Sequence, residues 1–168
     1  MIGAADLHKA IVTLWDDNDL DDSFTNLWAD SDVDLFPVLH DSEATPGQPF
    51  PYCVFQVSPG FVRTRMTRTV NSQWQTVDVP MQFNIHAKEI SGDARTAKRL
   101  ASDLAAAVMA VYGGHPTEPP QDGELDNGNF LLAQYQNDYG VRTGDEEYLW
   151  IVSYVMRLDI PVRVSAVS

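Results

Sequence analysis

The sequence predicts an α+β protein in which an antiparallel-rich mixed β-sheet is packed by helices on one face. Apolar and polar residues alternate along Val77–His86, which is the period of a half-buried strand. Over about residues 91–112 apolar residues recur every three or four positions, which is the period of an amphipathic helix. Two elements that each have one apolar face bury those faces against each other. We therefore expect one domain, residues 1–168, with a projecting hairpin arm.

The N-terminal part predicts a helix, a polar stretch and a short strand. Apolar residues share one helical face over about residues 3–16, and Asp6 lies in the first turn, where the helix dipole favours a carboxylate. An acidic stretch over residues 16–34 can hold one short amphipathic turn. Leu35–Leu39 reads as a short strand, and a proline-rich connector leads from it to the next.

The middle of the chain predicts a hairpin and a long strand. Tyr52–Val57 is β-prone, Pro59-Gly60 marks a turn, and Phe61–Val70 reads as the second arm of a hairpin. This second arm mixes charged and apolar residues on both faces, as expected of an arm that projects from a domain and pairs with something else. In the strand that follows, Pro80 cannot donate a ladder hydrogen bond, so we expect an edge position or an irregularity there.

The C-terminal half predicts the main helix and two strands. Ser91 or Asp93 can cap the helix over about 91–112, and Gly113-Gly114 end it. Residues 113–129 form a long polar loop, a kind of loop that is usually functional or disordered. Phe130–Tyr139 and Tyr148–Val164 read as strands. The last of these is expected to lie centrally in the sheet at its start.

The charge of the chain is unevenly distributed. The net charge is −13, and residues 1–43 hold eleven acids and one base. Residues 118–147 hold eight acids and one base, whereas residues 44–77 hold three arginines and no acid. An acidic surface disfavours tight binding to duplex DNA, because that affinity comes largely from cations on phosphate. No apolar run approaches the roughly 20 residues of a membrane helix, and no signal peptide is expected.

The sequence holds no pattern typical of a catalytic, cofactor or metal site. The single cysteine, Cys53, lies in an apolar strand pattern and reads as a core residue. The four histidines stand far apart, and His86 reads as a polar residue at a strand end. The aspartates from Asp17 and from Asp30 alternate as in an EF-hand loop, but both registers lack its glycine at position six and its glutamate at position twelve. We expect a solvated acidic loop, with weak calcium binding left open. No phosphate-binding loop or nucleophile elbow occurs, so no enzyme, cofactor or metal is predicted.

The positive signal is the arginine-bearing arm. Its ordinary interpretation is a solvent-exposed hairpin, and its functional interpretation is contact with an acidic surface of a neighbouring copy or a partner. Contacts of this head-to-tail kind can close into rings. The candidate interface residues for a subunit or a tube are Arg63, Arg65, Arg68, Phe61 and Trp74.

The order of elements resembles the tail-terminator (tail-completion) proteins of long-tailed bacteriophages. The resemblance spans residues 1–160. It rests on the N-terminal helix, the proline-marked entry Pro49–Phe55, the strand Val77–His86, the helix from Ala94, and two late strands. It implies a virion protein without catalysis that is assembled in the host cytoplasm. It also implies a hexameric ring at the head-tail junction, with contacts to the tail tube protein and the head connector or neck protein.

A ring of this kind leaves a channel through which DNA passes without specific binding and involves no membrane. Acidic residues facing the channel would let phosphate slide past. The candidates for an acidic channel or surface are Asp17, Asp19, Asp21, Asp22, Asp122, Glu124 and Asp126. Two alternatives stay open: a head-closure or neck ring protein, and a small cytosolic module that binds a ligand or a peptide.

Overall fold

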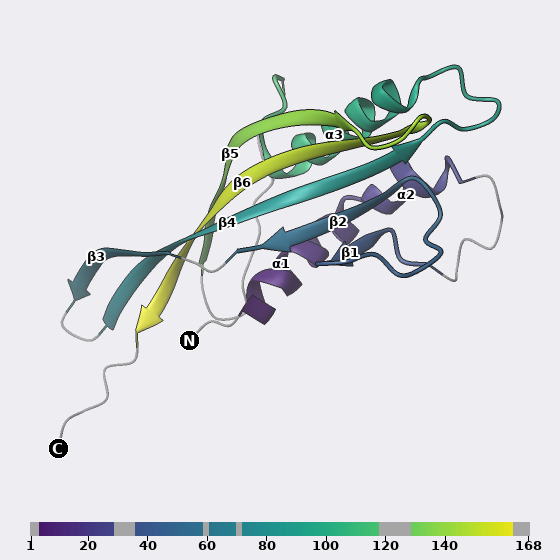
Figure 1. Ribbon diagram of the computed structural model, residues 1–168. Helices are drawn as coiled ribbons and strands as arrows, with labels where there is room; N and C mark the ends of the chain where they lie inside the picture. Colours follow the sequence, from purple (N-terminus) through teal and green to yellow (C-terminus); the bar gives the residue numbers. More distant parts are fainter. Residues whose placement is uncertain (1–3, 29–35, 59–60, 70–71, 118–128, 163–168) are drawn as a thin grey trace.

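The chain folds as one mixed sheet with three helices on one of its faces (Figure 1). A computed structural model describes residues 4–28, 36–58, 61–69, 72–117 and 129–162. In chain order the elements are α1 (Ala4–Asp17), α2 (Leu20–Thr25), β1 (Leu39–Asp41), β2 (Tyr52–Val57), β3 (Phe61–Thr69), β4 (Ser72–Lys88), α3 (Ala97–Tyr112), β5 (Asn129–Arg142) and β6 (Glu147–Val162). The predicted α+β class with an antiparallel-rich mixed sheet is confirmed.

The sheet is built around its two longest strands. Its order is β1-β2-β4-β6-β5, and β3 also pairs with β4. β1 and β2 are parallel, and the other pairs are antiparallel. β4 and β6 pair from Gln73 opposite Val162 to Lys88 opposite Glu147, which confirms that the last strand is central at its start. Among the described residues no helix is long and apolar enough to cross a membrane.

The core lies between the sheet and the helices. Val79, Met81, Phe83 and Ile85 of β4 point to this side, and each is at most 7% exposed. Tyr112, near the end of α3, is buried against Phe83 with their rings 4.6 Å apart. Alternation along β4 thus places its apolar side chains under the helices and its polar ones on the opposite face, as its sequence predicts.

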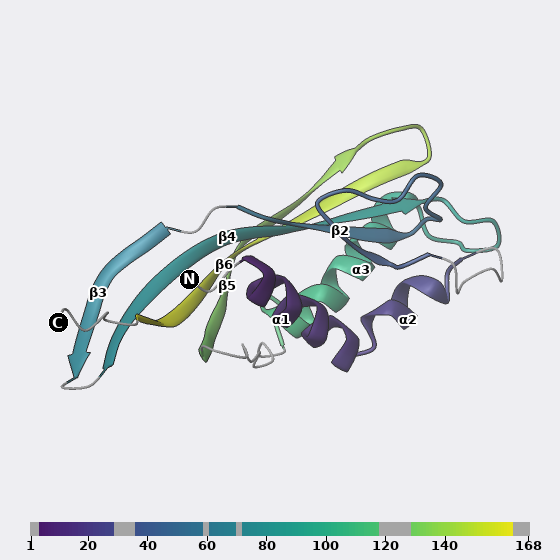
Figure 2. The ribbon, with the colours of Figure 1, turned by 90° about the horizontal axis from the view of Figure 1, so that it is seen from below.

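One end of the sheet extends beyond the helical layer (Figure 2). We call this end the arm. It consists of β3, the first part of β4 (residues 72–78) and the residues of β6 that pair with that part (157–162). The projecting arm predicted from the sequence is therefore present, but its pairing differs. The sequence predicts a hairpin between Tyr52–Val57 and Phe61–Val70, whereas both strands pair with β4, one after the other along the same edge.

Pro80 lies where the pairing of β4 passes from β2 to β3. β2 reaches Met81 and β3 reaches Asp78, so Pro80 lies at the junction. Its carbonyl accepts a hydrogen bond from the Ser58 N–H at 2.9 Å on this side, where the missing N–H would also point. The irregularity predicted at Pro80 is confirmed, although β4 is not an edge strand.

Two predicted boundaries are wrong. α3 begins at Ala97, about six residues after the predicted start, and its N-cap is Thr96, whose side chain accepts from the Arg99 N–H. Asp93 does not cap the helix, because it accepts from the Arg95 N–H and binds the Arg95 guanidinium. The first strand covers Leu39–Asp41 in place of Leu35–Leu39. The predicted turn at Pro59-Gly60 lies outside the described residues.

Candidate functional site

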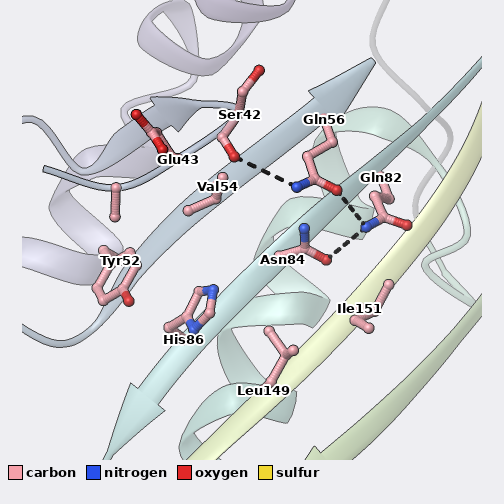
Figure 3. A pocket seen from close by; sticks show the side chains of 11 residues that line it. Ser42, Glu43, Tyr52, Val54, Gln56, Gln82, Asn84, His86, Leu149 and Ile151 are labelled. Carbon is pink, nitrogen blue, oxygen red and sulfur yellow. Dashed lines mark hydrogen bonds between the residues drawn. The ribbon is translucent and has the colours of Figure 1, made fainter. Parts of the chain in front are cut away.

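The face of the sheet opposite the helices has no covering element among the described residues (Figures 1 and 2). An open hollow of about 400 Å³ lies on it (Figure 3). Its lining comes from the loop that follows β1, and from β2, β4 and β6: Ser42, Glu43, Ala44, Tyr52, Val54, Gln56, Gln82, Asn84, His86, Leu149 and Ile151. The hollow therefore spans three strands and the loop after a fourth.

A row of side-chain amides crosses the floor of the hollow. Gln82 Nε2 donates to Gln56 Oε1 at 3.0 Å and to Asn84 Oδ1 at 3.1 Å. Gln56 Nε2 in turn donates to the Ser42 carbonyl at 3.5 Å (Figure 3). The row links β2, β4 and the loop after β1 through neutral side-chain amides, each of which has both donors and acceptors. It offers hydrogen bonds without charge.

The end of the hollow near the start of β6 holds a stacked aromatic pair. The rings of Tyr52 and His86 are 4.6 Å apart and 11° from parallel. Burial lowers the pKa of the His86 imidazole, and the nearby Glu147 carboxylate opposes this with a smaller rise. Burial also raises the pKa of the Tyr52 hydroxyl. Both side chains are therefore neutral at pH 7.

The uncharged surface continues beyond the hollow across the sheet. Residues paired directly across neighbouring strands share a face, so the pairing defines this surface. We call it the neutral face: Tyr52, Val54 and Gln56 of β2, Pro80, Gln82, Asn84 and His86 of β4, Leu149, Ile151, Ser153 and Val155 of β6, and Gln134, Asn137, Tyr139 and Val141 of β5. It is bounded toward the arm by the Asp78–Arg157 ion pair (2.9 Å) and at the other end by Lys88 opposite Glu147.

Apolar side chains are exposed on the neutral face. Tyr139 and Val141 are 50% and 42% exposed, and they lie opposite Ile151 and Leu149 of β6, which are half-buried. Such side chains beside neutral amides are suited to contact with another surface, because little charge has to be desolvated.

The predicted interface residues lie together on the arm. Phe61 is opposite Asp78, Arg63 is opposite Thr76, and Arg68 is opposite Gln73. The register shifts between Arg63 and Thr67, so Arg65 lies within a bulge or irregularity. Trp74 of β4 lies between Thr67 of β3 and Pro161 of β6. The structure thus places all five candidates in the part of the sheet that extends past the helices.

The predicted acidic residues fall into two groups. Asp17 ends α1, and Asp19, Asp21 and Asp22 lie at or in α2, which is in the helical layer. Asp122, Glu124 and Asp126 lie outside the described residues. Within the described part of the chain, no group of three or more His, Cys, Asp or Glu side chains could hold a metal ion.

The carboxylates around α2 have structural contacts of their own. Trp15 Nε1 donates to Asp21 Oδ1 at 2.6 Å, which ties α2 to the buried Trp15 ring. Burial raises the pKa of the neighbouring Asp16, with further rises from Asp21 and Asp17. Repulsion from Asp21 and Asp17 therefore disfavours the charged form of Asp16. Cys53 is fully buried, and its burial raises its thiol pKa, which confirms its interpretation as a core residue.

Sequence reasoning missed the neutral face. The even positions of β4 read only as a polar face, although Gln82, Asn84 and His86 carry no charge at pH 7. A second sign of this face was that Leu149 and Ile151 are apolar although they alternate with the core residues of β6 and so point away from the core. Both signals gain meaning only once the register places these residues side by side.

Comparisons with known proteins identify no family. No family model and no curated protein matches the chain. Among solved structures, a chain from the virion of a native gene transfer agent particle has a TM-score of 0.40 and 14% identity, over 73% of this chain and 78% of its own. A second, whose name states no function, has a TM-score of 0.43 and 13% identity, over 98% of this chain and 100% of its own. Similarities at these levels carry no argument about function.

Proposed function

We propose that this chain is a structural virion protein that caps the head-proximal end of a phage tail tube. Copies join into a ring, hexameric according to the sequence resemblance, between the tail tube protein and the head connector. DNA passes through the central channel without specific binding. The activity is geometric: the subunit closes a ring and presents two sides to two partners.

The arm is the observation that carries this proposal. It extends the sheet past the helices, so its faces lack the cover that the body of the sheet has (Figure 2). Among the described residues β3 pairs only with β4, so its other edge keeps backbone donors and acceptors for another chain. Two of its three parts, β3 and β4 through Val77, belong to the acid-free stretch of residues 44–77 in a chain of net charge −13, whereas its β6 part carries Asp159 opposite Thr76. An arm with this charge and a free edge supports contact with a neighbouring acidic copy.

The acidic residues support a channel or surface that repels nucleic acid. The carboxylates of Asp17, Asp19, Asp21 and Asp22 are gathered at the α1–α2 junction, away from the arm. On a channel wall they would repel phosphate and let DNA slide, because retention of DNA requires cations. They serve equally well on the outer surface, where they keep rings from associating with nucleic acid.

The experiment that tests this function is assembly on purified tail tubes. We expect native mass spectrometry at micromolar concentration to give a ring, electron microscopy to give a central hole, and the ring to add to one end of tubes. A strict monomer that leaves tubes uncapped would contradict the proposal. Capping of a portal complex in place of tubes would favour the head-closure or neck alternative.

The hollow on the neutral face favours a second candidate, a ligand- or peptide-binding module. Its volume of about 400 Å³ falls within the range of small-molecule sites, and its lining combines apolar side chains with amides, the His86 imidazole and the Glu43 carboxylate. In that case a panel of neutral amide-bearing peptides should raise the melting temperature of the protein. Unchanged melting with every peptide, together with a ring in images, would exclude this candidate.

A further inference from the structure

We infer that the neutral face is the docking surface for the arm of a second copy of this chain. The inference rests on the proposed ring and names the two surfaces that form each of its junctions. The arm of one subunit lies across the uncovered sheet face of the next, and each subunit gives one arm and receives another.

The chemistry of the neutral face selects a protein partner. A chain of net charge −13 repels its own copies over most of its surface, and the neutral face is a wide area where that repulsion is absent. Cores of protein interfaces are depleted in charge and enriched in aromatic residues. Tyr52 and Tyr139 provide aromatic surface at opposite sides of this face, and the amide row provides hydrogen bonds between them.

The size of the neutral face suits an arm. Strands about 4.8 Å apart and residues about 3.3 Å apart make the four-strand face about 20 Å by 25 Å, on the order of 500 Å². A standard interface buries about 800 Å² on each partner, so one such junction is small. It buries about 1,000 Å² in total, the size of a weak interface, and a closed ring compensates because every subunit is held by two such junctions. β3, with its nine residues, is about 30 Å long and spans the face from end to end.

Charge at the border of the neutral face selects the arm as the occupant. Carboxylates prevail along the border at the β5–β6 turn and beside the hollow, where the acids are Glu43, Glu89, Asp145, Glu146 and Glu147 and the bases are Lys88 and Arg142. One of these bases is engaged locally, since Arg142 donates to the Gly144 and Asp145 carbonyls. The arm brings Arg63, Arg65 and Arg68 to this border. Two arms would repel each other instead, because like charges on paired strands are destabilising.

The polarity of the contact follows from the positions of its two halves. The arm projects from one end of the molecule, and the neutral face lies on the body (Figures 1 and 2). A contact between two different surfaces is heterologous, and its repetition closes a ring when the rotation between neighbours divides a full turn, whereas any other rotation gives an open filament. A self-pairing neutral face would give a closed dimer in its place.

The test uses two variants that each lose one half of the junction. The arm variant is Arg63→Gln, Arg65→Gln, Arg68→Gln, which removes the cations without adding carboxylates that the lysines of the face variant would attract. The face variant is Tyr139→Lys, Val141→Lys, which adds cations at two exposed positions on β5. Val12→Lys is the matched control, because Val12 is similarly exposed (38%) but lies on α1. Circular dichroism and melting curves confirm that each variant is folded.

We expect each variant alone to be monomeric where the wild type and the Val12→Lys control form rings, with the assembly midpoint raised at least tenfold in concentration. An equimolar mixture should give a one-to-one heterodimer and nothing larger. The arm variant keeps an intact face and the face variant keeps an intact arm, so a single junction forms and growth stops.

Three results would overturn the inference. The face variant could assemble like the wild type, the mixture could stay monomeric up to about a hundred micromolar, or the arm variant could dimerise through its own neutral face. None of these results contradicts the capping of tail tubes by a ring, which the assembly experiment on purified tubes tests by itself. A wild type that is itself monomeric would overturn the ring and this inference together.

Discussion

The ion pair at the root of the arm gives a stability prediction that can be worked out from the structure. Asp78 of β4 and Arg157 of β6 lie directly opposite each other where the arm leaves the body. Arg157 Nε donates to Asp78 Oδ1 at 2.9 Å, and a second contact from the guanidinium reaches Oδ2 at 3.5 Å. The Asp78 side chain is 12% exposed and that of Arg157 is 35% exposed.

The magnitude follows from one good charge-assisted hydrogen bond in a partly solvated setting. Such bonds contribute about 1.5–3 kcal/mol when buried, and exposed ion pairs contribute less than about 1 kcal/mol. With Arg157 about one-third exposed, we expect a coupling free energy of about 1.5 kcal/mol. In a chain of this length that corresponds to a fall of about 3–6 °C in melting temperature for Asp78→Asn.

A double-mutant cycle measures this coupling. Asp78→Asn, Arg157→Gln and the double variant are unfolded in urea at one protein concentration, because association shifts apparent stability. The double variant should be more stable than the sum of the two single losses predicts, since no charge is left facing a neutral partner. A coupling below about 0.5 kcal/mol would refute the reasoning and reduce the pair to an ordinary surface contact.

Three further predictions concern other contacts of the fold. Tyr112→Phe removes the 2.6 Å hydrogen bond to the Ile11 carbonyl of α1 and should cost about 1–2 kcal/mol in urea unfolding; an unchanged midpoint would contradict this. Burial lowers the folded-state pKa of His86, so protons bind better to the unfolded chain and stability should fall as the pH drops below about 6.5. His86→Gln should lack this part of the pH dependence in thermal melts, and identical profiles would argue against it. Gly140→Ala places a Cβ 2.4 Å and 2.7 Å from two aromatic rings of β6 and should cost about 1–3 kcal/mol, whereas Gly144→Ala, with its nearest contact at 3.5 Å, is the control; equal losses in both would rule out the crowding.

The sequence predicted best those elements whose residues alternate or repeat without interruption. The strand Tyr52–Val57 has the bounds that its pattern indicates, and Gly113 ends α3, where its N–H bonds to the Met109 carbonyl. The start of α3 was placed too early because helical spacing of alanines extends back to Ala94. Ala94 is exposed, and the turn before it is held by Asp93 and Arg95, so local side-chain bonds override the pattern there.

Strand pairing depended on lengths that no local pattern reveals. β4 is 17 residues long, and β2, with six, covers only its second half. The free first half of β4 is the nearest partner for β3, which is joined to it through residues 70–71. A hairpin between β2 and β3 would have left that half of β4 without a neighbour on this side. Its backbone N–H and C=O groups would then lack hydrogen-bond partners in the sheet, which disfavours that arrangement.

Of the two candidate surfaces, one could be predicted from the sequence and the other could not. The β3 part of the arm could be recognised from one stretch of sequence, because its arginines and the lack of acids around them are continuous over residues 44–77. The neutral face could not, because it joins alternate residues from four strands that span Tyr52 to Val155. Its recognition also requires that no helix covers it, which depends on the handedness and length of the connections and not on any residue of the face.

Pro80 connects these two surfaces through one strand. Because Pro80 has no N–H, one ladder hydrogen bond is missing on the edge of β4 where β2 gives way to β3. The sheet is therefore divided at this point into a body, whose strands carry the neutral face, and an arm that carries the arginines. Both parts share β4 and β6 as a continuous frame, with the Asp78–Arg157 pair bridging those strands next to the division. A shared frame fixes the direction of the arm relative to the face, and a ring of defined size requires that this angle be the same in every subunit.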